Sequence, residues 1–382
     1  MYVRRMIVYQ LLAVCPMGLE SIVAKEVQEL GYETRVENGR IYFQGDASAL
    51  IKANLWLRTA DRVKLIIGQF EAKTFDDLFE QTKNLSWENY ISENGQFPVQ
   101  GRSLKSTLHS VPDVQAITKK AIVERLKKAY EVSGWLDESG AKYPVEVNIL
   151  KDRVLLTIDT SGSGLNKRGY RLAQGEAPIK ETLAASLVKL ANWKGDTPLI
   201  DPFCGSGTIA IEACLIAQNI APGFNRSFVS EQWDIIPDGL FDQLRDEADQ
   251  QADYDKEIEI YASDIDPKMV EIAKRNADEV GVGDIIKFEV KDVNTLTIAH
   301  EGPIGLIGNP PYGERIGDRD EVEAMYRYLG TLLHQNPQLS LYIMTSHKAF
   351  EHLVNRKATK RRKLFNGYIE TTYYQYWANK SE

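Results

Sequence analysis

Short apolar runs alternate with helical stretches over the second half of the chain. The runs lie at residues 197–203, 257–263, 285–290, 304–308 and 341–345. Residues 208–217 and 267–280, between them, carry apolar side chains at helical spacing. Buried strands that alternate with helices are typical of a doubly wound, Rossmann-like α/β sheet. Residues 360–365 and 367–377 predict a closing antiparallel strand pair that turns at Asn366 and Gly367.

The first half has a different pattern. Strands are expected near residues 6–14, 40–44, 62–70, 97–102, 145–150 and 153–158, and helices near 17–30, 46–57, 74–84 and 113–130. This interleaving fits mixed α+β modules better than one parallel sheet. Residues 161–164, Ser-Gly-Ser-Gly, have the composition of a hinge between the halves.

Composition excludes several classes of protein. Apolar residues make up 43% and charged residues 26% of the 382 residues, an ordinary globular balance. We see no secretion signal and no uncharged apolar stretch of about eighteen residues, so we expect a cytoplasmic protein that does not enter membranes. Cys15, Cys204 and Cys214 form no Cys-x-x-Cys pair, so neither a disulfide framework nor a bound metal is expected.

Charge is distributed unevenly along the chain. Residues 1–171 contain 24 Lys and Arg against 21 Asp and Glu, a net +3, and residues 172–382 contain 22 against 33, a net −11. The total of −8 does not suggest a polyanion partner. The small positive excess of the first half leaves both chance and nucleic-acid binding open.

The segment Asp-Pro-Phe-Cys-Gly-Ser-Gly-Thr at 201–208 lies where a predicted strand ends and a helix begins. Glycine there lets the backbone approach a ligand, and ligands of such sheets bind beyond the carboxyl ends of the strands. Residues 205–210 also match the dinucleotide fingerprint G-x-G-x-x-A, but the next strand ends in its acid 57 residues after Gly207 rather than about 20. We therefore expect a different small cofactor, bound by Asp201, Phe203, Gly205, Gly207 and Thr208.

Acids follow the next two strands. Asp264 could accept hydrogen bonds from both hydroxyls of a ribose, and Asp292 could accept one from an adenine amino group. Each has a structural alternative: Asp264 or Asp266 could cap the helix that begins at Pro267, and Asp292 could belong to a surface turn. We assign Asp264 to the ribose and the cap to Asp266, and both readings of Asp292 stay open.

The fourth strand ends in Asn309-Pro310-Pro311-Tyr312. The prolines fix the backbone and remove two N–H donors, so this turn offers carbonyls that only accept. The Asn309 side-chain oxygen and the Pro310 carbonyl could hold an N–H₂ group with its lone pair directed at an electrophilic methyl group, while Tyr312 stacks on the planar group that carries it. Such catalysis would work by positioning and electrostatics. A purely structural turn is the alternative.

Together, the motifs at 201–208, 263–266 and 309–312 resemble class I S-adenosylmethionine-dependent methyltransferases that act on amino nitrogens. The segments 177–184, 211–213, 221–223 and 363–367 extend the resemblance to the large-subunit ribosomal RNA guanine-N2 methyltransferases of the RlmL type. This resemblance implies S-adenosyl-L-methionine as cofactor, with Pro178, Lys180 and Asn309 beside it. It also implies that the guanine N2 amine meets Asn309, Pro310, Pro311 and Tyr312.

The first half resembles the same family at residues 17–20, 54–62 and 74–79. These segments are similar to its ferredoxin-like module and its RNA-binding THUMP domain, expected here at residues 1–68 and 69–160, with the methyltransferase domain at 161–382. The implied partner is RNA, as ribosomal RNA or a pre-ribosomal particle. Some members carry a second methyltransferase domain, whereas this sequence has the motifs of one. The resemblance therefore implies a standalone enzyme of ribosomal RNA processing.

Several basic residues could contact the RNA backbone, although a solvated charged face is the alternative for each. They are Arg102, Lys105, Lys119, Lys120, Lys167, Arg168, Arg171 and, near the target nucleotide, Arg315.

Asn-Pro-Pro-Tyr alone does not choose among guanine N2, adenine N6, cytosine N4 and a glutamine amide. The resemblance to the RlmL type implies guanine-N2 methylation of RNA, first of all 23S ribosomal RNA. Adenine-N6 methylation of RNA or DNA, or a non-catalytic ribosome-assembly factor, is the alternative.

Overall fold

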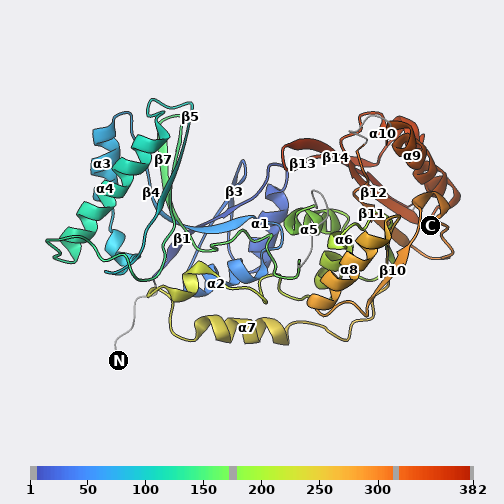
Figure 1. Ribbon diagram of the computed structural model, residues 1–382, viewed down its shortest axis with the longest axis horizontal. Coiled ribbons are helices and arrows are strands. Elements are labelled where there is room, and N and C mark those ends of the chain that lie inside the picture. Colours follow the sequence, from blue (N-terminus) through green and yellow to red (C-terminus); the bar gives the residue numbers. More distant parts are fainter. Residues whose placement is uncertain (1–6, 172–178, 313–317, 379–382) are drawn as a thin grey trace. The chain divides into compact units, whose positions relative to one another are not determined.

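The computed structural model describes residues 7–171, 179–312 and 318–378 (Figure 1). The chain divides into two compact units, each with its own seven-stranded sheet. The first unit contains the described residues up to Cys15, Val23–Leu165 and Arg226–Glu247. The second contains Pro16–Ile22, Asn166–Asn225 and the described residues from Ala248 onward.

The sheet of the first unit has the strand order β2-β3-β1-β4-β7-β6-β5, and only its β5–β6 pair is parallel. Its strands are β1 Tyr9–Val14, β2 Arg35–Glu37, β3 Arg40–Gly45, β4 Arg62–Glu71, β5 Val99–Leu104, β6 Val145–Leu150 and β7 Arg153–Asp159. The helices along the same stretch are α1 Glu20–Glu29, α2 Ala47–Trp56, α3 Phe75–Lys83, the 3-10 turn η1 Trp87–Asn89 and α4 Val111–Ala129.

Local sequence explains where these helices begin. Thr74 precedes α3 and accepts a hydrogen bond from the Asp77 backbone, while the Asp77 carboxylate accepts one from the Thr74 backbone. This reciprocal pair is a capping box, which satisfies donors that a helix start leaves unpaired. Asp46 caps α2 in the simpler way, by accepting from the Ala49 backbone.

The two predicted N-terminal modules share one continuous sheet. Strand β4 runs through the expected boundary at residues 68 and 69, and it pairs with β1 on one side and β7 on the other. A bulge between Ile66 and Gly68 interrupts the register at this point. The modules are α+β as expected, whereas the division at 1–68, 69–160 and 161–382 stays a prediction.

A segment from the second half of the chain packs into the first unit. Arg226 donates to the carbonyls of Gly164 and Ser163 at 2.6 and 2.7 Å. Trp233 stacks on Tyr143 with the ring centroids 5.0 Å apart. The segment contains the 3-10 turn η2 Val229–Gln232 and most of helix α7 Leu240–Gln250. The sequence pattern did not reveal this return of the chain.

The sheet of the second unit has the strand order β10-β9-β8-β11-β12-β14-β13. Its first five strands are parallel, and β14 runs antiparallel to β12 and β13. The strands are β8 Leu199–Asp201, β9 Ile260–Asp264, β10 Ile286–Val290, β11 Ile304–Gly308, β12 Leu339–Thr345, β13 Lys360–Asn366 and β14 Ile369–Tyr376. The predicted Rossmann-like sheet with a closing antiparallel strand is confirmed.

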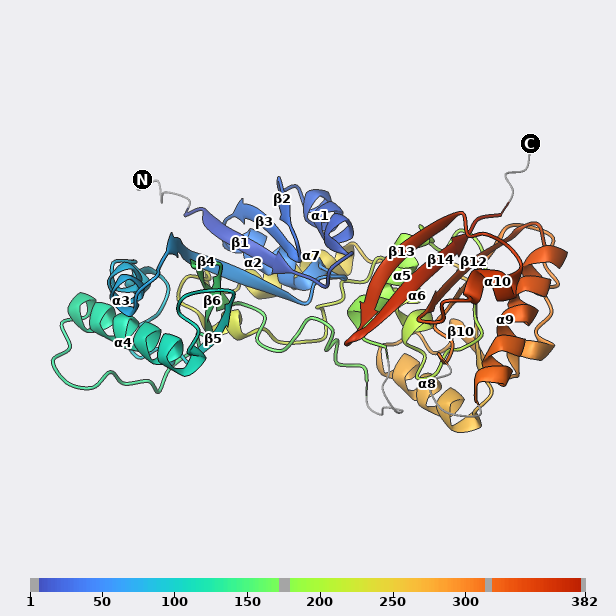
Figure 2. The same ribbon diagram turned by 90° about the horizontal axis from the view of Figure 1, so that it is seen from above.

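Helices lie on both faces of this second sheet (Figures 1 and 2). One side carries α5 Glu181–Leu190, α6 Thr208–Ala217 and α8 Pro267–Glu279, and the other carries α9 Asp318–Gln335 and α10 Phe350–Val354. The 3-10 turn η3 Val293–Thr295 packs against α9. Leu306 and Leu341 of the sheet, Leu329 of α9 and Phe350 of α10 are fully buried in one core. Because both faces are covered, polar groups of the central strands can reach a ligand only at the strand ends.

Within the described ranges, no helix is both long and apolar enough to cross a bilayer. The same residues contain no group of three or more His, Cys, Asp or Glu side chains that could hold a metal ion. The three cysteines are buried and unlinked.

Candidate active site

The turn between β8 and α6 opens into a cavity. Gly205 and Gly207 have positive φ angles of 49° and 83°, a conformation that glycine adopts without strain. A Cβ atom on Gly205 would meet only the Met269 side chain, at 3.9 Å, whereas one on Gly207 would lie 3.0 Å from Ala273 of α8. Gly207 therefore lets two helices pack closely, and Gly205 leaves its backbone open to a ligand.

Asp264, at the end of β9, holds this turn in place. Its Oδ2 accepts from the Gly205 backbone N–H at 3.0 Å, and its Oδ1 accepts from the Asp266 N–H at 3.0 Å. Asp266 itself caps α8 by accepting from the Lys268 N–H at 2.9 Å, as expected. Asp264 is half-buried and lines the cavity, so part of its carboxylate still faces the space where a ribose is expected.

Asp201 lies behind the turn and is fully buried. Its Oδ1 accepts from the Phe203 N–H at 3.3 Å, and no donor among the described residues reaches its Oδ2. Burial, followed by the nearby charge of Asp264, raises the pKa of Asp201 to about 8. Asp201 does not line the cavity, so its position supports a role behind the glycine turn, and direct contact with the cofactor stays a prediction.

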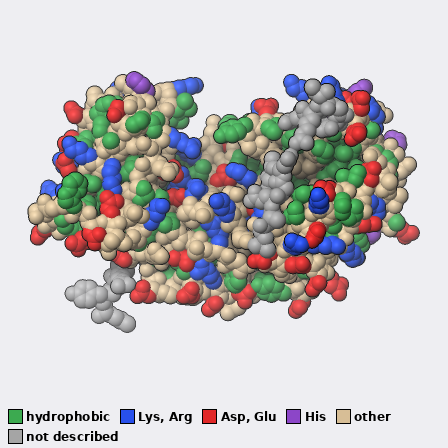
Figure 3. All heavy atoms as spheres, in the orientation of Figure 1, with side chains coloured by type: hydrophobic (Ala, Val, Ile, Leu, Met, Phe, Trp, Pro, Cys, Tyr) green, Lys and Arg blue, Asp and Glu red, His purple; other side chains and the backbone are tan. Residues whose placement is uncertain are grey.

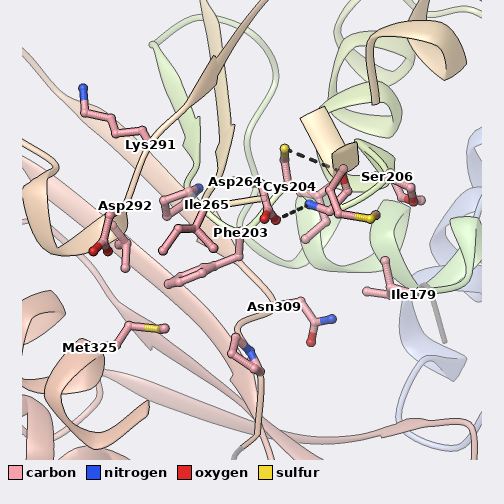
Figure 4. A pocket seen from close by; sticks show the side chains of 17 residues that line it. Ile179, Phe203, Cys204, Ser206, Asp264, Ile265, Lys291, Asp292, Asn309 and Met325 are labelled. Atoms are coloured by element: carbon pink, nitrogen blue, oxygen red, sulfur yellow. Dashed lines mark hydrogen bonds between the residues drawn. The ribbon is translucent and has the colours of Figure 1, made fainter. Parts of the chain in front are cut away.

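The cavity has a volume of about 370 Å³ and lies beyond the carboxyl ends of β8, β9, β10 and β11 (Figure 4). Polar and apolar side chains contribute to its lining. The lining includes Ile179, Phe203, Gly205, Thr208, Asp264, Ile265, Met269, Asp292, Val293, Asn309, Pro311 and Met325. The sequence pattern predicted the acids, whereas Ile265 and Val293 were missed, although each directly follows a predicted acid.

These residues fit a nucleoside-containing cofactor. Asp264 and Asp292 supply carboxylates at two neighbouring strand ends, while Ile265 and Val293 supply apolar surface for a flat ring. Asp292 also caps η3, where it accepts from the backbone and side chain of Asn294. Both readings of Asp292, turn residue and cavity acid, therefore apply to its position.

The turn at the end of β11 is fixed by three hydrogen bonds. The Tyr312 hydroxyl donates to Asn309 Oδ1 at 2.7 Å, and Asn366 Nδ2 donates to the Tyr312 hydroxyl at 3.4 Å. The buried Tyr326 hydroxyl donates to the Pro311 carbonyl at 3.1 Å. Thr345, at the end of β12, shares a further hydrogen bond with Tyr326 at 2.9 Å. Asn309 and Pro311 both line the cavity, so this turn and the glycine turn face the same space.

The segment before α5 was expected beside the cofactor. Ile179 lines the cavity, and Lys180, directly before α5, is exposed. Pro178 lies outside the described residues, as does Arg315.

Two arginines that we expected to contact RNA are turned inward. Arg168 pairs with Glu212 at 3.3 Å, with 3% and 0% of the two side chains exposed. Arg171 lies 3.2 Å from Glu181 and donates to the Thr208 hydroxyl at 3.1 Å. Their buried position gives them a structural role next to the glycine turn and does not support contact with an RNA backbone, because a buried charge must be compensated locally.

The other predicted RNA contacts differ in accessibility. Arg102, Lys105, Lys120 and Lys167 are exposed. Lys119 is half-buried, pairs with Glu138 at 2.6 Å and lies 3.4 Å from the centroid of the Phe97 ring. Figure 3 shows basic and acidic side chains intermixed over the face in view. Exposure alone therefore selects no RNA surface in the first unit.

Family models match three stretches of the chain. Residues 168–375 match the RMKL-like methyltransferase domain, residues 10–64 the RlmL ferredoxin-like domain and residues 72–159 the THUMP domain. The first of these covers more than half of the chain. This chain belongs to the RMKL-like methyltransferase family. Family membership confirms the resemblance to these methyltransferases, and the roles of the cavity residues stay predictions.

Relatives of this family match over nearly the whole chain. The chain is 57% identical to "Putative RNA methyltransferase YpsC" of Bacillus subtilis, covering 97% of this chain and 96% of that protein. It is 34% identical to the ribosomal RNA large subunit methyltransferase K/L of Psychromonas ingrahamii, covering 92% of this chain but 48% of that protein. The chain thus spans about half the length of the K/L relatives.

Two similar solved structures have the same fold. A protein from Listeria monocytogenes, described as a "predicted N6-adenine-specific DNA methylase", is 54% identical, with a TM-score of 0.94 over 98% of this chain and 97% of that one. SMU.472, described as a putative methyltransferase, is 43% identical with a TM-score of 0.94, covers 98% of this chain and 99% of that one, and was crystallised with S-adenosylhomocysteine (SAH). The predicted cofactor, S-adenosyl-L-methionine, is therefore confirmed for the family.

Proposed function

We propose that this protein transfers a methyl group from S-adenosyl-L-methionine to the exocyclic N2 amine of a guanine in RNA, first of all large-subunit ribosomal RNA. The observation that carries the proposal is the turn 309–312, which faces the same cavity as the glycine turn and whose asparagine oxygen is oriented by Tyr312. This arrangement supports transfer to a planar amine beside a nucleoside cofactor.

Several residues would hold the cofactor, which supplies an electrophilic methyl group on a sulfonium. Asp264 would accept from the ribose hydroxyls and Asp292 from the adenine amine, with Ile265 and Val293 against the ring. Gly205 allows the backbone to come close, and the buried Asp201 supports the glycine turn from behind by accepting from the Phe203 N–H. These assignments are supported by the lining of the cavity.

The acceptor amine would be held by oxygens alone. Asn309 Oδ1 and the Pro310 carbonyl each accept one N–H of the amine, which directs the nitrogen lone pair along the remaining direction. The Tyr312 hydroxyl occupies one lone pair of Oδ1 and restrains the amide, which leaves the other lone pair to accept from the amine. The amine loses its proton after the transfer, so no strong base is required. Stacking of Tyr312 on the guanine is part of the proposal.

The choice of RNA rests on the relatives and on the first unit. The K/L relatives are named ribosomal RNA methyltransferases, and the THUMP match covers residues 72–159. Guanine N2 rests on the resemblance of the motifs to the RlmL type. The name of the Listeria relative favours adenine N6 as a second candidate, since that amine is also planar and would fit the same pair of acceptors.

Nucleoside mass spectrometry separates these candidates. Deproteinised 23S ribosomal RNA is incubated with the protein and methyl-labelled S-adenosyl-L-methionine and then digested. Label in N2-methylguanosine is expected. Label in N6-methyladenosine instead would identify adenine, and not guanine, as the methylated base. Label in duplex DNA alone would reject RNA. Failure to bind S-adenosyl-L-methionine or SAH in calorimetry would support a non-catalytic assembly factor instead.

A further inference from the structure

The strongest concentration of positive charge in the second unit lies outside the RNA contacts predicted from the sequence. Six of the eight residues at 356–363 are Lys or Arg, although residues 172–382 as a whole carry a net charge of −11. They lead into and along β13, the end strand of the sheet (Figure 2). We call residues 356–376 the basic hairpin.

Half of these cations lack local compensation. Arg361 pairs with Glu351 at 3.2 Å and Lys363 with Glu370 at 2.6 Å, and Arg362 donates to Ser21 at 2.9 Å. The exposed side chains of Arg356, Lys357 and Lys360 have no hydrogen bond or ion pair within the described ranges. These three cations lie within five residues, so their mutual repulsion favours a bound polyanion.

The tip of the hairpin carries an exposed aromatic ring. Tyr368 follows Gly367, whose φ angle is 62°, and its side chain is fully exposed. A single exposed aromatic residue is common on protein surfaces, but the ring here directly follows a basic strand. Aromatic rings beside cations are the usual means of binding unpaired RNA, because every base can stack on them.

The hairpin leads to the proposed acceptor site. Strand β14 is antiparallel to β12 and pairs Thr372 with Thr345, so the tip lies at the carboxyl end of β12. At that end Asn366 donates to the Tyr312 hydroxyl, which in turn donates to Asn309. Lys360, at the other end of β13, pairs with Gln375, which pairs with Tyr342 in the middle of β12. A strand of seven residues extends about 20 Å, so an RNA strand that runs along β13 from the acceptor turn would meet these cations several nucleotides from the target.

Protection of a sheet edge is the competing explanation, because lysines on an end strand prevent pairing with other chains. The middle of β13 is already covered: a Cβ atom on Gly18 would lie 2.6 Å from the Lys363 carbonyl, and Ser21 accepts from Arg362. Edge protection also does not require Arg356 and Lys357, which precede the strand.

We propose that the basic hairpin binds the unpaired RNA strand that continues from the target nucleotide along β13. Arg356, Lys357 and Lys360 contact its phosphates, and Tyr368 stacks on a neighbouring base. This inference rests on the proposed RNA methylation and deepens it, since it locates the element that presents the nucleotide to Asn309.

The test uses the full chain and deproteinised 23S ribosomal RNA in filter binding at several salt concentrations. The triple variant R356A/K357A/K360A is expected to bind about 10- to 100-fold more weakly, with a salt slope smaller by about 2 to 3, since each lost phosphate contact removes roughly 0.7 to 0.9. The matched control K194A/K274A/R275A removes three exposed cations elsewhere in the second unit and should bind as the wild type does. The Y368A variant should bind the RNA about tenfold more weakly, and Y368F, which keeps the ring, should bind it as the wild type does.

Calorimetry with SAH reports whether each variant retains the folded cofactor site. Wild-type RNA affinity and salt slope in a triple variant that binds SAH would overturn the inference, and so would an equal loss in the control. Unchanged affinity of Y368A would overturn the stacking contact. If the wild-type protein itself binds SAH but no ribosomal RNA, the proposed function fails together with this inference.

Discussion

The two sheets of this protein place their polar residues in different ways. In the second sheet all three residues of β8 and all five of β11 are buried, and polar side chains appear only where these strands end. In the first sheet β6 alternates buried and partly exposed residues along its length. A sheet covered on both faces concentrates its chemistry at one edge, whereas a sheet with an open face distributes polar groups over that face.

The largest effect is expected at Asn309, the polar residue that follows β11, because the chemistry of the second sheet is concentrated at its strand ends. N309A removes one acceptor of the proposed amine site, so turnover should fall about 10²- to 10³-fold, the usual effect of losing one preorganised catalytic hydrogen bond. The measurement is single-turnover methylation of ribosomal RNA, with SAH affinity determined in parallel. N336A, an asparagine change at the end of α9, should retain turnover. Full activity of N309A would refute the proposed mechanism.

Asp201, at the end of β8, tests the same edge through pH. Its pKa is about 8 in the folded protein and near 3.8 when unfolded, so between these values only the folded chain keeps the proton. The free energy of unfolding should therefore fall as pH rises from about 4 to 8, by on the order of a few kcal/mol. Urea unfolding at pH 5 and pH 8 should show a smaller fall for D201N than for the wild type. Parallel behaviour of the two would contradict the raised pKa.

Gly308 tests the packing behind that edge. A Cβ atom there would lie 2.7 Å from the Phe203 ring, so G308A should lower the free energy of unfolding by about 1–3 kcal/mol. It should also weaken SAH binding, because Phe203 lines the cavity. Gly305 lies on the same strand with its nearest neighbour at 3.4 Å, in ordinary contact. G305A is therefore the matched control, and equal losses in both variants would show that the Phe203 contact is irrelevant.

The smallest effect is expected on the first sheet. Arg153 of β7 lies 3.8 Å from Glu71 of β4, with 81% and 68% of the side chains exposed. Water and salt screen such a pair, so its coupling in a double-mutant cycle of R153A and E71A should be about 0.5 kcal/mol or less. Chemical unfolding measures it. A coupling above about 1 kcal/mol would show that the open face is more tightly organised than its exposure indicates.

Much of the fold could be predicted because most elements have a clear local pattern. The glycine turn, the capped helix at Pro267 and the strand pair at Asn366 are encoded by adjacent residues. Strand β2, Arg35–Glu37, was missed because all three of its residues are exposed and no alternation marks it. The return of residues 226–247 to the first unit was also missed, since it depends on contacts such as Trp233 with Tyr143, ninety residues away.

The candidate site shows the same limit. The cavity acids could be named because each ends a strand, but the roles of Arg168 and Arg171 could not. In sequence they belong to a basic surface run, and their partners Glu212 and Glu181 become neighbours only in the folded chain. The basic residues at 356–363 were visible in the sequence, and the structure adds their connection to Tyr312 through Asn366.

The return of residues 226–247 also determines when the protein can fold during synthesis. The first unit needs Arg226 and Trp233 to complete its packing, so about 60 residues of the second unit must leave the ribosome before the first is finished. Nor does either unit form one contiguous stretch of chain. A single cut between residues 165 and 166 would separate η2 and α7 from the surface on which they pack, so we expect the halves to be stable together and poorly soluble apart.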